Sequence, residues 1–339
     1  MRVVCFGEIM LRLAPPGYLR FVQSNTLEAT YGGGEANVAV TLANFGADAC
    51  YVTKLPDNPM GRAAVNELRR YGVCTDKIIF GGERLGIYYL EKGASQRASL
   101  VVYDRKHSAI SEAAETDFDW QNIFAGAEWF HFTGITPAIS EKAAALTLNA
   151  CRAAKNMGLA VSCDLNYRKN LWSKDEARKT MTSLMEYVDL LIANEEDSES
   201  VFGIKAAGAD VAGGKISHDG YKEVAETLIK KFNFKNVAIT LRESISASDN
   251  NWTGMLCDGG EFYFSKTYPV HIVDRVGGGD AFGGGLIYAM MNGYAKQDAI
   301  EFAVAASCLK HSIEGDFNHV SLGEVTSLMR GGGSGRVQR

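Results

Sequence analysis

The stretch DRVGGGDAFGGG, residues 274–285, contains six glycines and places one acid, Asp280, between two glycine triplets. The segment HIVD that leads into it predicts a strand, and DAFGGGLIYAMMNG predicts a helix, so the first triplet, residues 277–279, connects the two. In open α/β sheets, ligands bind where strands end and helices begin, and glycines leave the amide N–H groups there uncovered. Together with the helix dipole, this arrangement predicts a binding site for an anion such as phosphate.

An acid beside such a loop would repel a bound phosphate, unless it accepts the proton of a hydroxyl that attacks the phosphate. Asp280 is therefore a candidate general base, and Gly277, Gly278 and Gly279 are candidates for holding the charge of a transferring phosphoryl group. The alternative is an acid that only caps the helix. The second triplet lies inside the helix, where it costs roughly 3 kcal/mol relative to alanine, which indicates close backbone packing or a ligand.

Strands and helices alternate through the middle and the end of the chain, as in the helix SEKAAALTLNACRAAKNMG followed by the strand LAVSCDLN. This order predicts an α/β fold with a mostly parallel central sheet and helices on both faces. EATYGGG and GIYYLEKGASQRASLVVYDR interrupt the alternation and predict hairpins of a second, small sheet. We expect a single domain over residues 1–330, with a discontinuous β lid from about 10–31 and 84–107, and a flexible tail over 331–339.

Composition excludes several classes of protein. A hydrophobic fraction of 46% and a charged fraction of 22% are those of a soluble globular protein, and a net charge of −5 argues against nucleic-acid binding. No apolar stretch is long enough to span a bilayer, and MRVVCFGEIM does not read as a signal peptide. Neither the seven cysteines nor the six histidines have metal-site spacing, so we expect free thiols and a cytoplasmic protein. The first strand also lacks the G-x-G-x-x-G fingerprint of a dinucleotide enzyme.

Two segments resemble signatures of a known family. DRVGGGDAFGGGLI resembles the C-terminal D-T-x-G-A-G-D signature of the PfkB, or ribokinase-like, carbohydrate kinases, and YGGGEANVAVTLANFG resembles their N-terminal glycine signature. Their order and separation fit over nearly the whole chain. The resemblance implies a ribokinase-like three-layer α/β/α sandwich with a small β-sheet lid over the sugar, and ATP with Mg²⁺ as the phosphoryl donor. Arg275, Gly278 and the segments GEIMLRL, VVYDR, DLNYRKNLW and TLRES are similar to the branch that phosphorylates 2-keto-3-deoxygluconate.

The resemblance also implies roles for individual residues. It makes Asp280 the catalytic base, and the glycines of residues 277–279 the anion hole. NEED, residues 194–197, resembles the N-x-x-E motif that helps to place magnesium and phosphate, here with the shorter Asp197 as its acid. TLRES replaces the usual T-x-G-x-x-G nucleotide loop. The residues implied for the nucleotide are Asn194, Thr240, Arg242, Gly277 and Gly279, and those implied for the sugar are Gly33, Gly34, Asn37, Tyr89, Tyr103, Arg105, Arg168 and Asp280.

The choice of sugar depends on charge. Relatives that bind neutral sugars hold the sugar hydroxyls with an aspartate after the first strand, but the first aspartate here is Asp48. Arg105 and Arg168 stand instead at predicted sugar-facing positions, and two guanidiniums suit a carboxylate. The alternatives are a surface ion pair, such as Arg105 with Asp104, and lid packing for the two tyrosines.

We therefore expect a phosphotransferase with an alcohol group as acceptor. It would phosphorylate the primary hydroxyl of 2-keto-3-deoxygluconate and give 2-keto-3-deoxy-6-phosphogluconate. Two alternatives stay open: a kinase of the same family for another sugar or sugar acid, and a non-catalytic sugar-binding protein. Unpaired edges of the lid sheet further predict a homo-oligomer.

Overall fold

The computed structural model describes residues 1–194, 196–206 and 217–333, so most of the predicted tail lies outside the described residues. Its central sheet has the strand order β14-β13-β12-β11-β10-β9-β1-β4, and β15 pairs with the first half of β13. The pairs from β4 through β12 are parallel, whereas β13 pairs antiparallel with β12, β14 and β15. The strands are β1 (Arg2–Phe6), β4 (Asp48–Val52), β9 (Trp129–Thr133), β10 (Ala160–Asp164), β11 (Leu190–Ala193), β12 (Asn236–Ser244), β13 (Asp249–Asp258), β14 (Glu261–Phe264) and β15 (Tyr268–His271).

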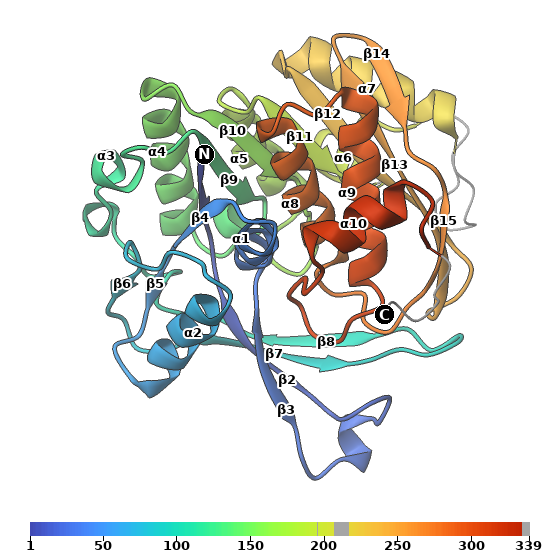
Figure 1. Cartoon of the computed structure of the whole chain (residues 1–339). Helices are drawn as coiled ribbons and strands as arrows, with labels where there is room; N and C mark the ends of the chain where they lie inside the picture. Colours follow the sequence, from blue (N-terminus) through green and yellow to red (C-terminus); the bar gives the residue numbers. More distant parts are fainter. Residues whose placement is uncertain (195, 207–216, 334–339) are drawn as a thin grey trace.

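Helices cover both faces of this sheet, as Figure 1 shows. Side chains of β1 alternate between two core clusters, with Val3 and Cys5 in one and Val4 and Phe6 in the other, as a strand buried on both faces requires. The first cluster packs under α1 (Gly34–Asn44), α2 (Pro59–Arg70), α8 (Gly278–Met291), α9 (Lys296–Lys310) and α10 (Leu322–Met329). The second packs under α3 (Trp120–Ile123), α4 (Glu141–Asn156), α5 (Lys174–Met185), α6 (Asp197–Phe202) and α7 (His218–Phe232). These layers confirm the predicted three-layer α/β/α sandwich.

A second sheet of four strands extends away from the main body at the bottom of Figure 1. Its order is β3-β2-β7-β8, and its strands come from the segments that break the sequence alternation: β2 (Met10–Ala14), β3 (Glu28–Gly32), β7 (Gly86–Glu91) and β8 (Leu100–Asp104). We call it the lid sheet. The predicted domain limits themselves stay a prediction. The remaining short elements are β5 (Lys54–Leu55), β6 (Ile79–Phe80), η1 (Phe21–Gln23), η2 (Glu115–Asp117) and η3 (Thr136–Ala138).

The second glycine triplet has a packing role. A Cβ atom at Gly284 would lie 2.8 Å from Cβ of Thr41 on α1, and one at Gly285 would lie 3.1 Å from Cα of Ala303 on α9. Helix α8 therefore lies between two neighbours that approach its backbone directly, which confirms the close packing expected from the sequence.

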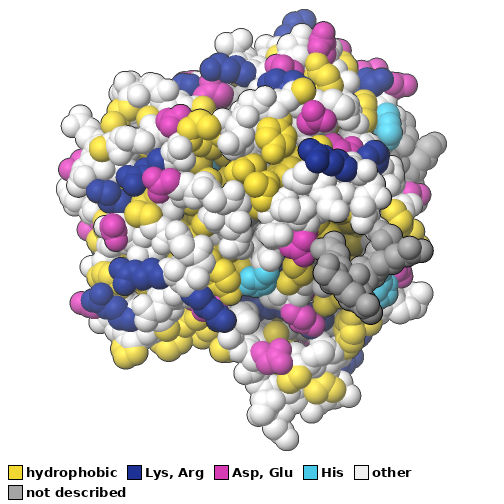
Figure 2. All heavy atoms as spheres, in the orientation of Figure 1, with side chains coloured by type: hydrophobic (Ala, Val, Ile, Leu, Met, Phe, Trp, Pro, Cys, Tyr) yellow, Lys and Arg dark blue, Asp and Glu magenta, His cyan; other side chains and the backbone are white. Residues whose placement is uncertain are grey.

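All seven cysteines are free, and no cluster of metal-ligating side chains occurs in the described residues. Among the helices of the described chain, none has the length and apolar character needed to cross a membrane. Figure 2 shows basic and acidic side chains interspersed over the visible face.

Candidate active site

A cavity of about 440 Å³ lies between the lid sheet and the main domain. The carboxyl ends of β10, β11 and β12 form one wall, the start of α8 forms another, and Met10, Tyr88, Val101 and Tyr103 of the lid close it from the opposite side. This is where ligands bind in open α/β sheets, and the volume suits a small ligand.

Asp280 lies in the first turn of α8 and lines this cavity. Its Oδ2 accepts a hydrogen bond of 2.6 Å from Nδ2 of Asn37, whose Oδ1 accepts one of 3.3 Å from the amide of Gly33. Burial and, to a smaller extent, the charge of Asp316 raise the pKa of Asp280 to about 6, against the opposing effect of the Asn37 hydrogen bond. A carboxylate with this pKa can accept a proton near neutral pH and is a chemically suitable base.

The loop before Asp280 contains two kinds of glycine. Gly277 and Gly279 line the cavity, and Gly277 adopts a left-handed conformation with φ of 82° that closes the turn onto the helix. Gly278 is buried instead, and a Cβ atom there would lie 2.5 Å from Cε1 of His311. Gly278, which was predicted with its neighbours to hold the charge of the transferring group, is thus not among the cavity-lining residues, and a side chain there would first meet the imidazole of His311.

The two predicted tyrosines lie on opposite faces of the lid sheet. Tyr103 lines the cavity, but Tyr89 does not, and its ring packs against Phe21 with centroids 6.3 Å apart. The lid residue beside Tyr103 is Tyr88, its register partner on β7. Because side chains of a strand alternate between faces, the sequence assignment was off by one residue.

Of the two arginines predicted to face the sugar, only one lines the cavity. Arg168 follows β10 and lines the cavity, where its charge favours the ionised forms of Asp164, Asp197 and Asp280. Arg105 is buried and donates from Nε to Glu8 at 2.8 Å, and its Nη2 also bonds this carboxylate. Arg105 is thus committed to Glu8 and lies outside the cavity lining, contrary to expectation.

The alternative pairing of Arg105 with Asp104 does not occur either. Asp104 accepts instead from Nη1 of Arg84 at 2.7 Å.

The residues predicted for the nucleotide lie just after β11 and in the second half of β12, as well as in the loop before α8. Asn194, Thr240 and Arg242 line the cavity, as does Arg275 from the anion loop. Arg275 donates to the carbonyl of Ala247 at 2.8 Å, and burial and the positive charge of Arg242 both lower its pKa. Two guanidiniums close enough to repel each other in one cavity favour binding of an anion between them.

Asp197 lies outside the cavity lining, which corrects its predicted place. Its carboxylate oxygens accept main-chain hydrogen bonds from Tyr167 at 3.1 Å and Asn194 at 3.0 Å, so it shapes the turn behind Asn194. The cavity acid on this side is Asp164, at the end of β10. Burial, followed by the charges of Asp197 and Asp280, raises its pKa well above the usual range. The position of Asp164 at a strand end could have identified it from the sequence.

Gly33 and Gly34 line the cavity at the start of α1, as predicted from the glycine signature. Glu35, one residue further, is buried behind them and was missed. Its Oε1 accepts from the amide of Thr133 at 2.9 Å and from the hydroxyl of Thr136 at 2.6 Å. This carboxyl group joins α1 to the end of β9. Burial raises its pKa to about 7, against these hydrogen bonds.

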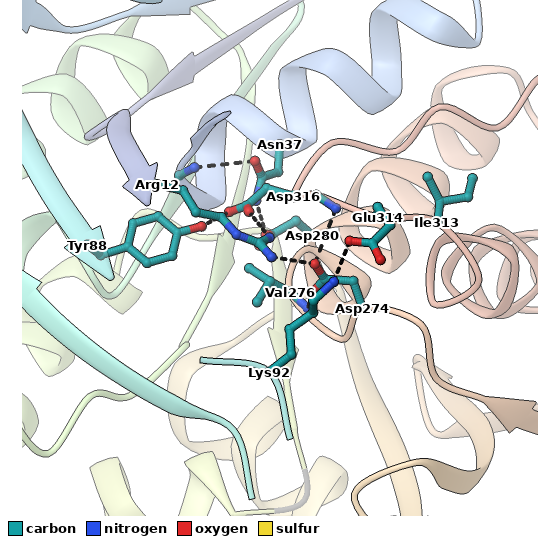
Figure 3. A network of polar contacts seen from close by, with 12 residues as sticks. Arg12, Asn37, Tyr88, Lys92, Asp274, Val276, Asp280, Ile313, Glu314 and Asp316 are labelled. Carbon is teal, nitrogen blue, oxygen red and sulfur yellow. Dashed lines mark hydrogen bonds and ion pairs between the residues drawn. The ribbon is translucent and has the colours of Figure 1, made fainter. Parts of the chain in front are cut away.

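A buried polar network continues from the cavity into the lid (Figure 3). Arg12 on β2 donates to Asp274 at 2.5 Å and to Asp316 at 2.7 Å, and the hydroxyl of Tyr88 donates to Asp316 at 2.5 Å. Asp316 lines the cavity. Arg12 belongs to the segment GEIMLRL, but no sequence rule pairs it with Asp274 or Asp316, which lie 262 and 304 positions away along the chain.

Comparison with known proteins agrees with this geometry. Residues 1–318 match the pfkB family of carbohydrate kinases. The chain belongs to this family. The pfkB membership confirms the resemblance read from the two glycine signatures and the predicted enzyme class, a phosphotransferase that acts on an alcohol group.

Individual known proteins are similar to this chain over nearly its full length. A 2-dehydro-3-deoxygalactonokinase of Haloferax volcanii is 33% identical over 98% of both chains. A 2-dehydro-3-deoxygluconokinase of Thermoproteus tenax is 28% identical over 93% of this chain and 89% of the relative. The crystal structure of a 2-dehydro-3-deoxygluconokinase from Thermotoga maritima superimposes with a TM-score of 0.94, with 55% identity over 98% of this chain and all of the other.

Proposed function

We propose that this pfkB kinase transfers the γ-phosphoryl group of ATP to the primary hydroxyl of 2-keto-3-deoxygluconate, also called 2-dehydro-3-deoxygluconate. The product would be 2-keto-3-deoxy-6-phosphogluconate. The observation that carries the proposal is Asp280, a cavity carboxylate with a pKa of about 6 at the start of α8, in one cavity with Arg168. The 55% identical structure of a 2-dehydro-3-deoxygluconokinase supports the choice of sugar.

In this proposal Asp280 accepts the proton of the sugar hydroxyl as the oxygen attacks phosphorus. Asn37 orients the carboxylate through its 2.6 Å hydrogen bond. The loop amides at Gly277 and Gly279 and the positive end of α8 would receive the negative charge that develops on the transferring group.

The nucleotide would extend from this loop toward Asn194, Thr240 and Arg242, which line the same cavity. Arg242 belongs to TLRES, the segment that stands where the family resemblance implies a glycine-containing nucleotide loop. With Arg275 it would supply charged donors to the phosphates in place of backbone amides.

Magnesium would enter with the nucleotide. Mg²⁺ usually keeps several waters and is held by one or two carboxylates together with substrate phosphates, so it needs no complete protein cage. Asp164 fits this role, because it lines the cavity and its ionisation is opposed by burial and by two neighbouring acids, which a cation would offset. The ion would neutralise phosphate charge, and Asp197 would contribute only by holding the turn at Asn194.

Arg168 would bind the carboxylate of the sugar acid, with the lid hydroxyls of Tyr88 and Tyr103 nearby. A charge-assisted hydrogen bond contributes roughly 1.5–3 kcal/mol, which corresponds to about 10–100-fold in kcat/KM. Arg105, which faces Glu8, would act on lid position instead.

The deciding experiment compares kcat/KM for 2-keto-3-deoxygluconate, fructose and ribose in the wild type, Arg168→Ala and Arg105→Ala. We expect the wild type to prefer the acid, and Arg168→Ala to lose about 10–100-fold on the acid alone. Arg105→Ala is the matched control and should affect acid and neutral sugars alike. A wild type that phosphorylates a neutral sugar equally well would overturn the substrate proposal.

A second candidate substrate is 2-keto-3-deoxygalactonate, because the 33% identical relative from Haloferax volcanii carries that kinase name. The two acids share the carboxylate, the keto group and the primary hydroxyl, so the machinery described would treat them alike. Including both acids in the same panel separates them.

The cellular setting belongs to the same proposal. Seven free cysteines, several of them buried, suit a reducing compartment, and we propose that the kinase works in the cytoplasm.

A further inference from the structure

Arg12 is a lid residue whose charged group is engaged with the catalytic domain. It lies in the middle of β2, is 3% exposed, and bonds the carboxylates of Asp274 and Asp316, two segments of the main domain (Figure 3). Burial alone would lower the pKa of Arg12, but the two carboxylates raise it overall, so the group stays a cation. A single buried guanidinium thus bridges two buried acids.

Asp274 is the residue that opens the anion loop. Its Oδ1 accepts from the amide of Val276 at 3.1 Å, and its Oδ2 accepts from Arg12 and, at 3.2 Å, from the amide of Gly315. One carboxylate therefore fixes the turn that leads into Gly277. The charge that holds this carboxylate in place comes from the lid.

Asp316 supports the same loop from its other side. A Cβ atom at Gly277 would lie 2.0 Å from the main-chain oxygen of Asp316, so the two backbones are in direct contact. Arg12 holds Oδ1 of Asp316, and Tyr88 holds Oδ2. Arg12 and Tyr88 are register partners on β2 and β7, so two adjacent lid strands both donate hydrogen bonds to the carboxylate of Asp316.

The loop also makes an apolar contact with the lid and a hydrogen bond with a lysine of the main domain. Val276 of the loop packs against the small lid cluster of Met10, Ala14, Tyr88 and Leu90. On the main-domain side, the fully buried Lys310 donates to the carbonyl of Asp274 at 3.4 Å. The loop is thus anchored at Asp274 from both sides, by Lys310 of the main domain and by Arg12 of the lid.

We propose that Arg12 is a positioning residue for phosphoryl transfer, which holds the loop of residues 274–279 in its working geometry only while the lid sheet is seated. The inference rests on the proposed function in that the loop receives the transferring group. It makes the lid part of the catalytic apparatus as well as a cover over the sugar. A buried ion pair is weak grounds for a stabilising role, since apolar replacements are often as stable, so a positional role explains its presence better.

The test compares Arg12→Met, which keeps an unbranched side chain but removes the guanidinium and its charge, with Arg12→Lys, which restores one cation. The measurements are kcat, KM for ATP and for the sugar that the wild type phosphorylates best, and ATP affinity by calorimetry, all per folded site. We expect Arg12→Met to lower kcat about 100-fold, the scale of a displacement of about 1 Å in a reacting group, with both KM values changed less than about threefold. Arg12→Lys should recover a large part of kcat.

Lys92→Met is the matched control. Lys92 also joins the lid to the loop of Asp316, through a 2.5 Å bond to Glu314, but the side chain of Glu314 is 61% exposed and neither residue touches Asp274. We expect its kcat to stay within about twofold of the wild type, since exposed partners contribute little.

Asp274→Asn provides a second route if Arg12→Met does not fold. It keeps the shape of the side chain but sets an amide N–H₂ against Arg12 or against loop amides, and the same loss of kcat at unchanged KM is expected. A kcat within about threefold of wild type in Arg12→Met, or in Asp274→Asn where only that variant folds, overturns the inference. Because the assay uses whichever sugar the wild type prefers, failure of the proposed substrate would not be mistaken for failure of this role.

Discussion

The surroundings of Asp280 make its carboxylate suitable as the proposed general base. The same acid at an ordinary helix start would be ionised well below neutral pH, but here burial raises its pKa to about 6 while Asn37 holds it in one orientation. Asp280→Asn removes the proton acceptor and retains the shape. We expect kcat to fall by about 10²–10⁴-fold with ATP affinity unchanged. Near-normal turnover in the purified variant would show that Asp280 is not the base and only caps the helix.

The pKa of Asp280 also predicts the pH dependence of the enzyme. A base works in its ionised form, so kcat/KM should fall tenfold per unit as pH drops below about 6. The Asn37 hydrogen bond lowers this pKa, as do the charges of Arg168 and Lys310, whereas burial and Asp316 raise it.

Asn37→Ala should therefore move the acidic limb of the profile to higher pH, besides any loss of sugar contacts. Profiles of kcat/KM between about pH 4.5 and 8.5 in both proteins provide the check. A limb that stays in place would show that Asn37 does not act on the base.

At the scale of an element, two adjacent glycines at the start of α8 have different expected roles, one in packing and one at the cavity. Gly278 and Gly279 are neighbours, but a Cβ atom at Gly278 would lie 2.5 Å from the ring of His311, while one at Gly279 would meet nothing within 4 Å. We expect Gly278→Ala to lower the free energy of unfolding by roughly 1–3 kcal/mol through overpacking.

Gly279→Ala should leave stability unchanged or raise it by up to roughly 1 kcal/mol, since alanine favours helix. Its methyl group would enter the cavity, however, and we expect kcat/KM for ATP to fall roughly 10–100-fold, less than loss of a whole oxyanion-hole donor costs. Denaturant titration and steady-state kinetics on the two variants measure both effects. Full activity in Gly279→Ala would contradict the placement of phosphate at this loop.

At the scale of the whole molecule, the outer face of the lid sheet predicts self-association. Leu100 and Val102 of the edge strand β8 are 50% and 49% exposed, and Val102 is the register partner of Tyr89, which also faces outward. An apolar face beside an unpaired strand edge is a surface for a second copy. The predicted homo-oligomer stays a prediction.

Val102→Asp should shift the protein toward monomer in sedimentation velocity. Ile245→Asp is the control, because Ile245 is 65% exposed but lies outside the lid sheet. A wild type that is monomeric at all concentrations, or equal effects of both variants, would exclude this interface.

Features that depend on neighbouring residues could be predicted from the sequence, whereas contacts between residues far apart along the chain could not. The anion loop, Asp280, the glycines at 33 and 34 and the alternation of strands and helices were all expected, because each depends on a few consecutive residues. Tyr89 was expected in place of Tyr88, because strand limits inferred from sequence can miss by one residue and one residue reverses the face. Arg105 was expected to face the sugar, because no sequence rule pairs it with Glu8, which lies 97 positions earlier.

Short-range chemistry was thus determined by the sequence alone: glycines that free a backbone, a helix that begins at the loop, and an acid in its first turn. The fold class followed as well, since alternating patterns admit few packed arrangements. Only the tertiary structure decided which charges meet. Arg12 is 262 positions from Asp274 and 304 from Asp316 along the chain, yet the three share one buried site, and a side chain at Gly278 would meet His311 instead of the cavity. The physical reason is that burial and ion pairing depend on the distances between elements, and these are set only when the lid, the sheet and the helices pack together.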